Sequence, residues 1–189
     1  MRFTAGVMLC LALSGCRAGV LAADPAGAVA LDKWRQIGAA PWVFSGPVAE
    51  AGPAEETGFL VSKVPYREAV ITVEFWIEDE TNSGIFVRCA KPTTITPDDC
   101  YEINIWDNHP QQEFRTGSIV KRQSPLVRVD TLGKWNKCRI ELRGNTITVT
   151  FNGIVTARLE DAVLPGGYVA LQYGGKGVVR FRNFRLSVD

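Results

Sequence analysis

Apolar and polar residues alternate with a period of two along much of the chain. The alternating runs, each predicted to be a strand, cover residues 70–78, 135–143, 146–151, 154–159, 168–173 and 178–188. Successive side chains on a strand point to opposite faces, so each run predicts one buried face and one exposed face. Asn152-Gly153 predicts a hairpin turn, because a type I′ turn needs positive φ at both central residues.

Many short strands separated by turn signals predict an all-β protein with a sandwich or barrel architecture. No segment has a long helical period, although a single helical turn is compatible with residues 26–34 or 160–163. The exposed positions of residues 137–150 are Lys, Arg, Glu and Thr, which is typical of a solvated sheet surface. The strands around Glu74, Phe86 and Glu102 instead carry aromatics and isolated charges there. We therefore expect two stacked sheets, one of which has a functional and concave outer face.

Residues 82–88 and 101–108 are the most informative runs for function. In the first, Gly84, Phe86 and Arg88 fall on the face opposite to the apolar positions. In the second, the positions opposite to the apolar ones are Glu102, Asn104 and Trp106. A face that combines carboxylate, guanidinium, amide and large aromatic groups suits a polar, ring-shaped ligand better than a lipid or a polyanion.

The N-terminus has the pattern of an export signal. Arg2 is followed by a short apolar region over residues 3–13, which is too short to span a bilayer. Leu13-Ser14-Gly15-Cys16 matches the bacterial lipobox, so residues 1–16 are interpreted as a lipoprotein signal with Cys16 as the lipid acceptor. The alternative is an ordinary signal cleaved near residues 22–23. Both predict export to the periplasm, with membrane contact only through an N-terminal lipid anchor.

Residues 17–30 are rich in Ala and Gly and are predicted to be a flexible tether, which leaves residues 31–189 as a single domain. The 189-residue chain has 21 basic and 20 acidic residues, and no basic stripe stands out. This composition argues against nucleic acid as a partner. No second apolar stretch is long enough to cross a membrane.

The cysteines fall into different classes. Cys10 leaves with the signal, and Cys138 is in step with apolar neighbours, as expected for a buried side chain. Cys89 and Cys100 flank the loop between the two informative runs. In an oxidising compartment they are expected to form a disulfide, the alternative being two unpaired thiols.

Taken together, these segments resemble the 3-keto-disaccharide hydrolase domain family, which has a concanavalin A-like jelly-roll fold of two antiparallel sheets. The matching segments are residues 82–88 (NSGIFVR), 101–108 (YEINIWDN), 115–119 (RTGSI), 133–136 (GKWN), 143–149 (RGNTITV), 151–153 (FNG), 171–172 (LQ) and 180–185 (RFRNFR). The resemblance implies cleavage of glycosides whose C3 hydroxyl has been oxidised to a ketone, by elimination followed by hydration or by hydrolysis. The C3 ketone makes the C2 proton acidic, so this chemistry needs a general base, a group that stabilises an enolate and an acid for the leaving group.

Glu102 is the first candidate for the general base or for a metal ligand, because neighbouring aromatics would desolvate it. Glu74 is a second candidate carboxylate on the equivalent face of its own strand. Arg88 is a candidate for holding the enolate, and a structural ion pair with Glu102 or Glu74 is the alternative. His109 is the only histidine and a candidate acid or base, although a lone loop histidine is often a bystander.

The remaining candidates are substrate-binding residues. Asn104 and Gln172 have amides that could bind sugar hydroxyls, and Trp76, Phe86 and Trp106 have rings that could stack on a sugar. Surface amides and strand aromatics packed on a loop are the structural alternatives.

A divalent metal is compatible with the side chains of Glu74, Glu102, Asp107 and His109, but their spacing does not require one. Asp107 has the opposite strand parity to Glu102 and is more simply explained as a turn residue.

A non-catalytic carbohydrate-binding module is the alternative function, and an envelope scaffold that contacts other proteins is a third hypothesis. Convergence of Glu74, Arg88, Glu102 and Gln172 in one cleft would favour the enzyme. A shallow groove lined only by aromatics would favour the binding module, and a face filled by loops would favour the scaffold.

Overall fold

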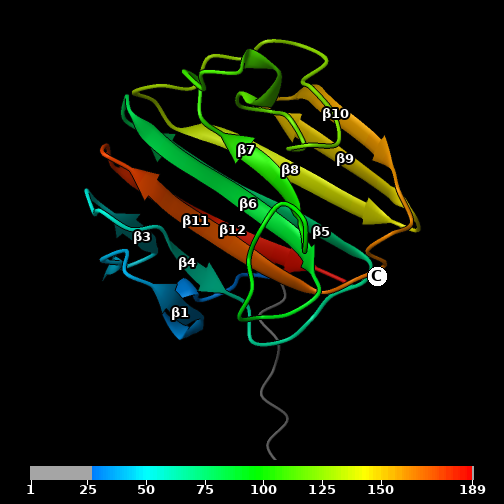
Figure 1. The fold of residues 1–189 in the computed structure, drawn as a ribbon. Coiled ribbons are helices and arrows are strands. Elements are labelled where there is room, and N and C mark those ends of the chain that lie inside the picture. The colour runs from blue at the N-terminus through cyan, green and yellow to red at the C-terminus, as the bar shows by residue number, and fades with distance from the viewer. Residues whose placement is uncertain (1–26, 189) are drawn as a thin grey trace, which may run out of the picture.

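The computed structural model describes residues 27–188, which form two antiparallel sheets packed face to face (Figure 1). The five-stranded sheet has the order β1 (Arg35–Gly38), β4 (Gly58–Val61), β11 (Tyr168–Gly175), β6 (Thr81–Cys89) and β7 (Tyr101–Ile105). The seven-stranded sheet has the order β10 (Ile154–Glu160), β9 (Thr146–Phe151), β8 (Asn136–Arg143), β5 (Ala69–Ile77), β12 (Val179–Ser187), β3 (Val48–Ala51) and β2 (Val43–Ser45). The predicted all-β sandwich is therefore confirmed.

Helix is confined to two 3-10 turns within the described residues, η1 (Leu31–Lys33) and η2 (Gln112–Phe114). The first of these lies inside the segment 26–34, where a helical turn was compatible with the sequence. Within residues 27–188 there is thus no helix that is long and apolar enough to cross a membrane.

The predicted boundary between tether and domain at residue 30 is too late in the chain. The Val29 N–H donates to the Phe184 carbonyl at 3.0 Å, and the Leu186 N–H donates to the Gly27 carbonyl at 2.9 Å. Residues 27–30 are thus tied to β12 by backbone pairing. The predicted signal, the predicted lipid acceptor Cys16 and the rest of the predicted tether lie outside the described residues.

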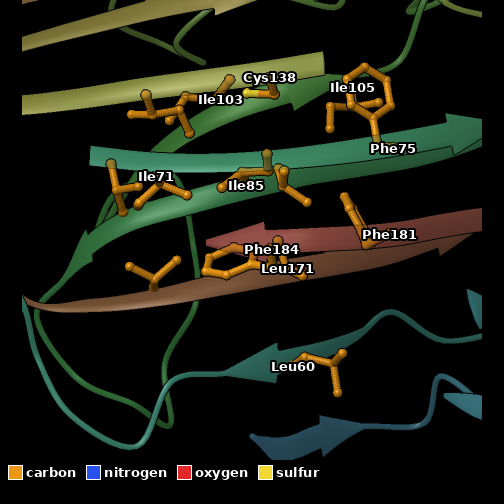
Figure 2. Packing of buried hydrophobic residues seen from close by; sticks show 14 of the residues in the cluster. Leu60, Ile71, Phe75, Ile85, Ile103, Ile105, Cys138, Leu171, Phe181 and Phe184 are labelled. Carbon is orange, nitrogen blue, oxygen red and sulfur yellow. The ribbon is translucent and has the colours of Figure 1, made fainter. Parts of the chain in front are cut away.

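The core fills the space between the two sheets. Inward side chains of both sheets, including Ile71 and Phe75 on β5 and Ile85 on β6, are fully buried (Figure 2). Strand β5 is the clearest case, since its residues alternate buried and half-buried along its whole length. The period-two pattern of the sequence is therefore the pattern of core and outer face.

Strand β6 departs from this alternation at its end. Arg88 has φ of 53°, and the pairing of β6 with β11 shifts register between Tyr168 and Ala170. This bulge turns Arg88 away from the outer face and leaves Cys89 on it. The Arg88 guanidinium is fully buried and donates from Nη2 to the Gly144 carbonyl at 2.6 Å, at the turn between β8 and β9.

Two connections lie at opposite ends of β6 and β7. Residues 90–100 join the two strands at one end, and residues 106–135 cover the other end before β8 begins (Figure 1). Part of the second connection runs along the free edge of β7. The Val120 N–H donates to the Glu102 carbonyl at 2.9 Å, and the Asn104 N–H donates to the Ser118 carbonyl at 3.1 Å.

We expect Ile85→Ala to lower the free energy of unfolding by about 2–5 kcal/mol, because it removes a fully buried side chain and leaves a cavity between the sheets. Thr148→Ser, on the outer face of β9, is the control and should change it by less than about 1 kcal/mol. Urea unfolding monitored by circular dichroism measures both values. Equal effects of the two substitutions would contradict this assignment of the core.

Candidate functional site

The outer face of the five-stranded sheet holds a hollow of about 440 Å³. Its floor is formed by outward side chains of β6, β7 and β11. Gly84 on β6 pairs with Gln172 on β11 and with Asn104 on β7, while Phe86 pairs with Glu102. The strand pairing alone thus places a carboxylate and two amides on one surface.

Gly84 makes room for the two central polar groups. A Cβ atom at this position would lie 3.3 Å from Glu102 Oε1 and 3.3 Å from Gln172 Oε1. Such contacts are tighter than ordinary packing, so the side chains of both residues lie over the backbone of β6 where only glycine leaves space. Glu102 and Gln172 therefore face the same point of the hollow from neighbouring strands.

The Glu102 carboxyl is withdrawn from solvent, with only 6% of the residue exposed. Burial raises its pKa from the ordinary value of 4.5 to about 7, and the Lys121 ammonium opposes this shift. A carboxyl with a pKa near 7 can both accept and return a proton at neutral pH, which is what a general acid–base group needs.

The Gln172 amide is an orphaned polar group. Its Oε1 is buried and has no hydrogen-bond partner among the described residues. Buried polar atoms are normally paired, so this unpaired oxygen in the lining of the hollow is available to accept a hydrogen bond from a hydroxyl of a ligand.

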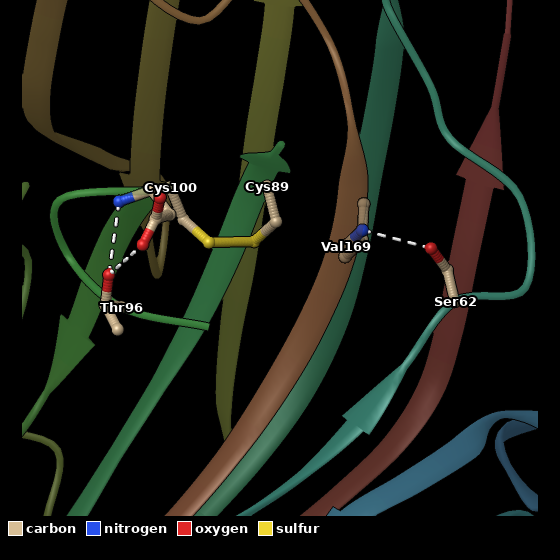
Figure 3. The surroundings of a disulfide bond; sticks show 6 residues. Ser62, Cys89, Thr96, Cys100 and Val169 are labelled. Carbon is tan, nitrogen blue, oxygen red and sulfur yellow. Dashed lines mark hydrogen bonds between the residues drawn. A yellow bond between two sulfur atoms is a disulfide. The ribbon is translucent and has the colours of Figure 1, made fainter. Parts of the chain in front are cut away.

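A disulfide joins Cys89 and Cys100 and closes the loop that walls one side of the hollow (Figure 3). Within this loop Ile95 is buried against Phe86, the two cysteines and Ala170. The Thr96 hydroxyl donates to the Asp99 carboxylate at 2.8 Å, which fixes the turn that follows. Ile95, Thr96 and Pro97 all line the hollow beside Glu102.

The opposite wall is aromatic. Trp106, His109 and Phe114 are packed edge to face, with ring centroids 4.5 Å apart for the first pair and 5.8 Å apart for the second. The His109 Nδ1 accepts a hydrogen bond from the Gln111 N–H at 3.0 Å. This bond leaves Nε2 as the nitrogen that can carry a proton, and His109 and Trp106 both line the hollow.

Asn104 lines the hollow, but its amide is occupied. Its Nδ2 donates to the Phe114 carbonyl, and its Oδ1 accepts from the Ile105 N–H at 2.9 Å. Asn104 therefore holds the aromatic wall to β7 with one N–H and one lone pair of its amide, and its role in binding sugar hydroxyls stays a prediction.

The structure does not bring Glu74 and Trp76 to this site. Both lie on β5, on the outer face of the seven-stranded sheet. Arg182 donates from Nε to the Glu74 carboxylate at 2.7 Å and lowers the pKa of that carboxyl. The guanidinium of Arg180 stacks over the Trp76 ring at 4.3 Å. Strand parity identified them as outward residues, but parity does not say which sheet a strand joins.

Arg88 is also absent from the hollow, because the bulge on β6 turns it away from the outer face. Its guanidinium donates to main-chain carbonyls of Gly144 and Leu164, at 2.6 and 3.5 Å, instead of pairing with Glu102 or Glu74. Both hypotheses for Arg88, the enolate-binding group and the ion pair, are thus corrected. Of the four residues whose convergence would favour an enzyme, Glu102 and Gln172 converge.

Of the predicted metal ligands, Glu102 and His109 both line the hollow, but Glu74 lies on the other sheet. The Asp107 carboxylate points into the loop, where it accepts hydrogen bonds from the Thr131 N–H and hydroxyl. Within residues 27–188 no group of three His, Cys, Asp or Glu side chains is placed to hold a metal ion. The donor set therefore does not fit the divalent metal considered above.

Several lining residues were not identified from the sequence. Phe59 on β4 packs edge to face with Phe86, with centroids 5.6 Å apart, and Thr57, Asn82 and Val120 complete the rim. Of these residues only Asn82 could have been predicted to face the hollow, since it has the same strand parity as Gly84. The others belong to segments without a clear alternation.

We expect Cys89→Ala/Cys100→Ala to lower the pKa of Glu102 toward its ordinary value, because the released loop would admit water to the carboxyl. The free energy of unfolding should also fall by about 2–4 kcal/mol, the usual effect of a lost disulfide. A carbon-detected NMR titration of the Glu102 carboxyl measures the pKa, with the unsubstituted protein as control. An unchanged Glu102 pKa in the folded variant would contradict this role of the loop.

Glu102→Gln should raise the free energy of unfolding at high pH only. In the unfolded chain the Glu102 carboxyl releases its proton near pH 4.5, whereas in the folded chain it retains the proton up to about pH 7. The folded state binds more protons between these values, so its stability falls as pH rises through this window and stays lower above it. Glutamine does not titrate, and the variant should be more stable by about 3 kcal/mol at pH 8 and nearly equal at pH 4. Urea unfolding at both pH values tests this, and an equal difference at both would refute it.

Known structures share this fold. A candidate glycosyl hydrolase from Parabacteroides distasonis matches with a TM-score of 0.68 and 22% identity, over 78% of this chain and 90% of that chain. A second candidate glycosyl hydrolase from the same organism matches with a TM-score of 0.65 and 16% identity, over 78% and 83% of the two chains. The carbohydrate-binding module CBM66 from Bacillus subtilis matches with a TM-score of 0.62 and 13% identity, over 81% and 95%. At these identities the matches establish the fold.

No curated protein matches the chain significantly. The model of the 3-keto-alpha-glucoside-1,2-lyase-like domain, however, matches residues 27–187, nearly all of the described sandwich. This agrees with the resemblance carried by the sequence motifs on β6, β7 and the later strands. The chain belongs to the 3-keto-alpha-glucoside-1,2-lyase-like domain family.

Proposed function

We propose that this protein cleaves glycosides that carry a ketone at C3 of the sugar, with Glu102 as the general base. The observation that carries the proposal is the buried Glu102 carboxyl, whose pKa is raised to about 7, at the floor of a hollow of about 440 Å³. That volume is in the range of small-ligand sites. Membership of the 3-keto-alpha-glucoside-1,2-lyase-like family supports the proposed class of substrate.

The reaction follows from the acidity of the C2 proton beside the ketone. The Glu102 carboxylate takes this proton, and the electron pair of the C2–H bond forms an enolate with its charge on the C3 oxygen. Collapse of the enolate breaks the bond from C1 to the leaving oxygen and gives an unsaturated ketone. Water then adds its oxygen to C1, and the proton that it loses balances the one that the leaving oxygen takes up to become an alcohol. C2 regains a proton from Glu102, and the net change is glycoside plus water to 3-keto sugar plus alcohol.

Two neighbouring side chains have matching roles. The Gln172 Oε1, which lies beside Glu102 and has no partner among the described residues, can accept a hydrogen bond from a hydroxyl of the sugar and so orient the ring. With the Nδ1 of His109 accepting from Gln111, its Nε2–H can donate a hydrogen bond to the departing oxygen. Trp106 and Phe86 provide apolar surface for the faces of the sugar ring.

The test is turnover of a panel of 3-keto-disaccharides and simple 3-keto-glucosides, with and without added divalent cation. We expect release of 3-keto-glucose, with kcat/KM rising with pH up to about 7, because the base must be deprotonated. Glu102→Gln should lower kcat by at least about 100-fold. Glu74→Gln is the matched control, a carboxylate on the other sheet, and should retain full activity.

Unchanged activity in Glu102→Gln would remove Glu102 from the mechanism. Sugar binding by the intact protein without turnover of any panel member would favour the alternative, a carbohydrate-binding module. This alternative is kept because the carbohydrate-binding module CBM66 has the same fold.

We also propose that the protein works in the periplasm, in agreement with its signal-like N-terminus. Support comes from the disulfide between Cys89 and Cys100, since such bonds persist in oxidising compartments. Fractionation of cells followed by mass spectrometry of the mature N-terminus tests both the location and the lipid on Cys16.

A further inference from the structure

The outer face of the seven-stranded sheet lies on the opposite side of the sandwich from the hollow beside Glu102 (Figure 1). Its strands alternate buried residues with outward residues that are exposed or half-buried, so the face is open to solvent. Among the outward residues of this sheet, basic side chains outnumber acidic ones by seven to four. The basic residues are Lys137, Arg139, Arg143, Arg158, Arg180, Arg182 and Arg185, and the acidic residues are Glu50, Glu74, Glu141 and Glu160.

The positive surplus of this face is hidden in the composition, because the whole chain has 21 basic and 20 acidic residues. The basic residues lie on β8, β10 and β12, and β5 pairs with both β8 and β12. Lys137 and Arg158 are exposed, on strands that only β9 separates. The fold thus gathers charges from distant segments onto one face and leaves an acidic surplus for the rest of the chain.

Two arginines of β12 are held along the sheet. Arg182 donates to the Glu74 carboxylate at 2.7 Å, and its guanidinium lies 3.8 Å from the centre of the Trp135 ring. Arg180 pairs in the same way with Glu50 on β3. These contacts keep the guanidinium groups close to the sheet, so the positive charge of the face is spread over its strands. A distributed charge of this kind is complementary to an extended anionic surface.

The chain enters the described structure beside the same face. Ala28 pairs with Arg185 on β12, next to the bond between the Leu186 N–H and the Gly27 carbonyl. The predicted lipid acceptor Cys16 precedes Gly27 by 11 residues, which span at most about 40 Å when fully extended. A lipid on Cys16 would therefore hold the seven-stranded sheet within that distance of a membrane.

We propose that the outer face of the seven-stranded sheet docks on a membrane that contains anionic phospholipids. The basic surplus is complementary to the lipid phosphates, and each basic side chain near such a surface adds to the attraction. Docking in this orientation leaves the hollow beside Glu102 on the side that faces away from the membrane, where a water-soluble substrate can enter it. This inference goes beyond the proposed function, and neither depends on the other.

Vesicle flotation tests the docking with protein that begins at residue 17. This protein keeps both sheets and the segment before them, and it lacks the predicted lipid acceptor, so binding reports on the folded domain alone. The vesicles contain either phosphatidylcholine alone or phosphatidylcholine mixed equally with phosphatidylglycerol. Thermal unfolding verifies that each variant is folded.

We expect binding to the anionic vesicles only, and we expect high salt to abolish it because screening shortens the range of the attraction. Each basic residue near an anionic surface contributes about fivefold to partitioning, so Lys137→Gln/Arg158→Gln should weaken binding about 25-fold. Lys63→Gln/Lys91→Gln is the matched control, which removes the same charge from exposed positions outside this sheet. The control should weaken binding by less than about threefold, because those charges lie away from the docked face.

An environment-sensitive fluorophore attached to an introduced cysteine reports the orientation. The native cysteines of residues 27–188 do not compete for the label, because Cys89 and Cys100 form the disulfide and Cys138 is buried. On Thr148→Cys, at the outer face of β9, the emission should shift when anionic vesicles are added. On Glu56→Cys, at an exposed position beside the hollow of Glu102, the emission should stay unchanged.

Equal binding to the two kinds of vesicle would overturn the docking, and so would equal losses in the two double variants. A shift of the emission on Glu56→Cys alone would overturn the orientation. Binding to an acidic polysaccharide such as polygalacturonate, without binding to vesicles, would also overturn the proposal and assign the face to an anionic polymer.

Discussion

The pairing of β6 between β11 and β7 is the constraint on which the rest of this molecule depends. It sets the register that places Ile85 in the core, and on the opposite face it places Gly84 between Gln172 and Asn104. A slip of one residue would exchange the two faces, so core and site are specified together. The packing that stabilises the sandwich therefore also keeps Glu102 and Gln172 in place.

The same arrangement lowers the stability of the folded state at neutral pH. The disulfide loop withdraws Glu102 from water, which raises its pKa into the range useful for proton transfer. Burial of this carboxyl disfavours the charged folded state at neutral pH, and the Lys121 ammonium opposes this effect only in part. Two features offset this loss of stability: the fully buried core between the sheets, and the disulfide that joins Cys89 to Cys100. Functional sites in general lower the stability of a protein, and the structure around them compensates for that loss.

Buried polar contacts hold the second wall of the site. Asn104 bonds to the Phe114 carbonyl, and Asp107 bonds to Thr131, so the long connection after β7 is anchored at several points. Arg115 adds an ion pair with Asp130 at 3.0 Å. These bonds keep Trp106 and His109 facing the hollow although both lie beyond the end of a strand. Residues first considered for ligand binding thus position the groups that line the site.

The sequence alone was enough to predict the all-β architecture, the family and the outward positions of Glu102 and Phe86. It could do so because a strand alternates its side chains with a fixed period and the family motifs occur in order along the chain. Tertiary structure decided what local pattern does not encode. Glu74 and Trp76 have the right parity but belong to the other sheet, and a bulge with positive φ turned Arg88 away. The walls, the unpaired amide of Gln172 and the raised pKa of Glu102 depend on segments distant in sequence, so they exist only once both sheets and their loops are assembled.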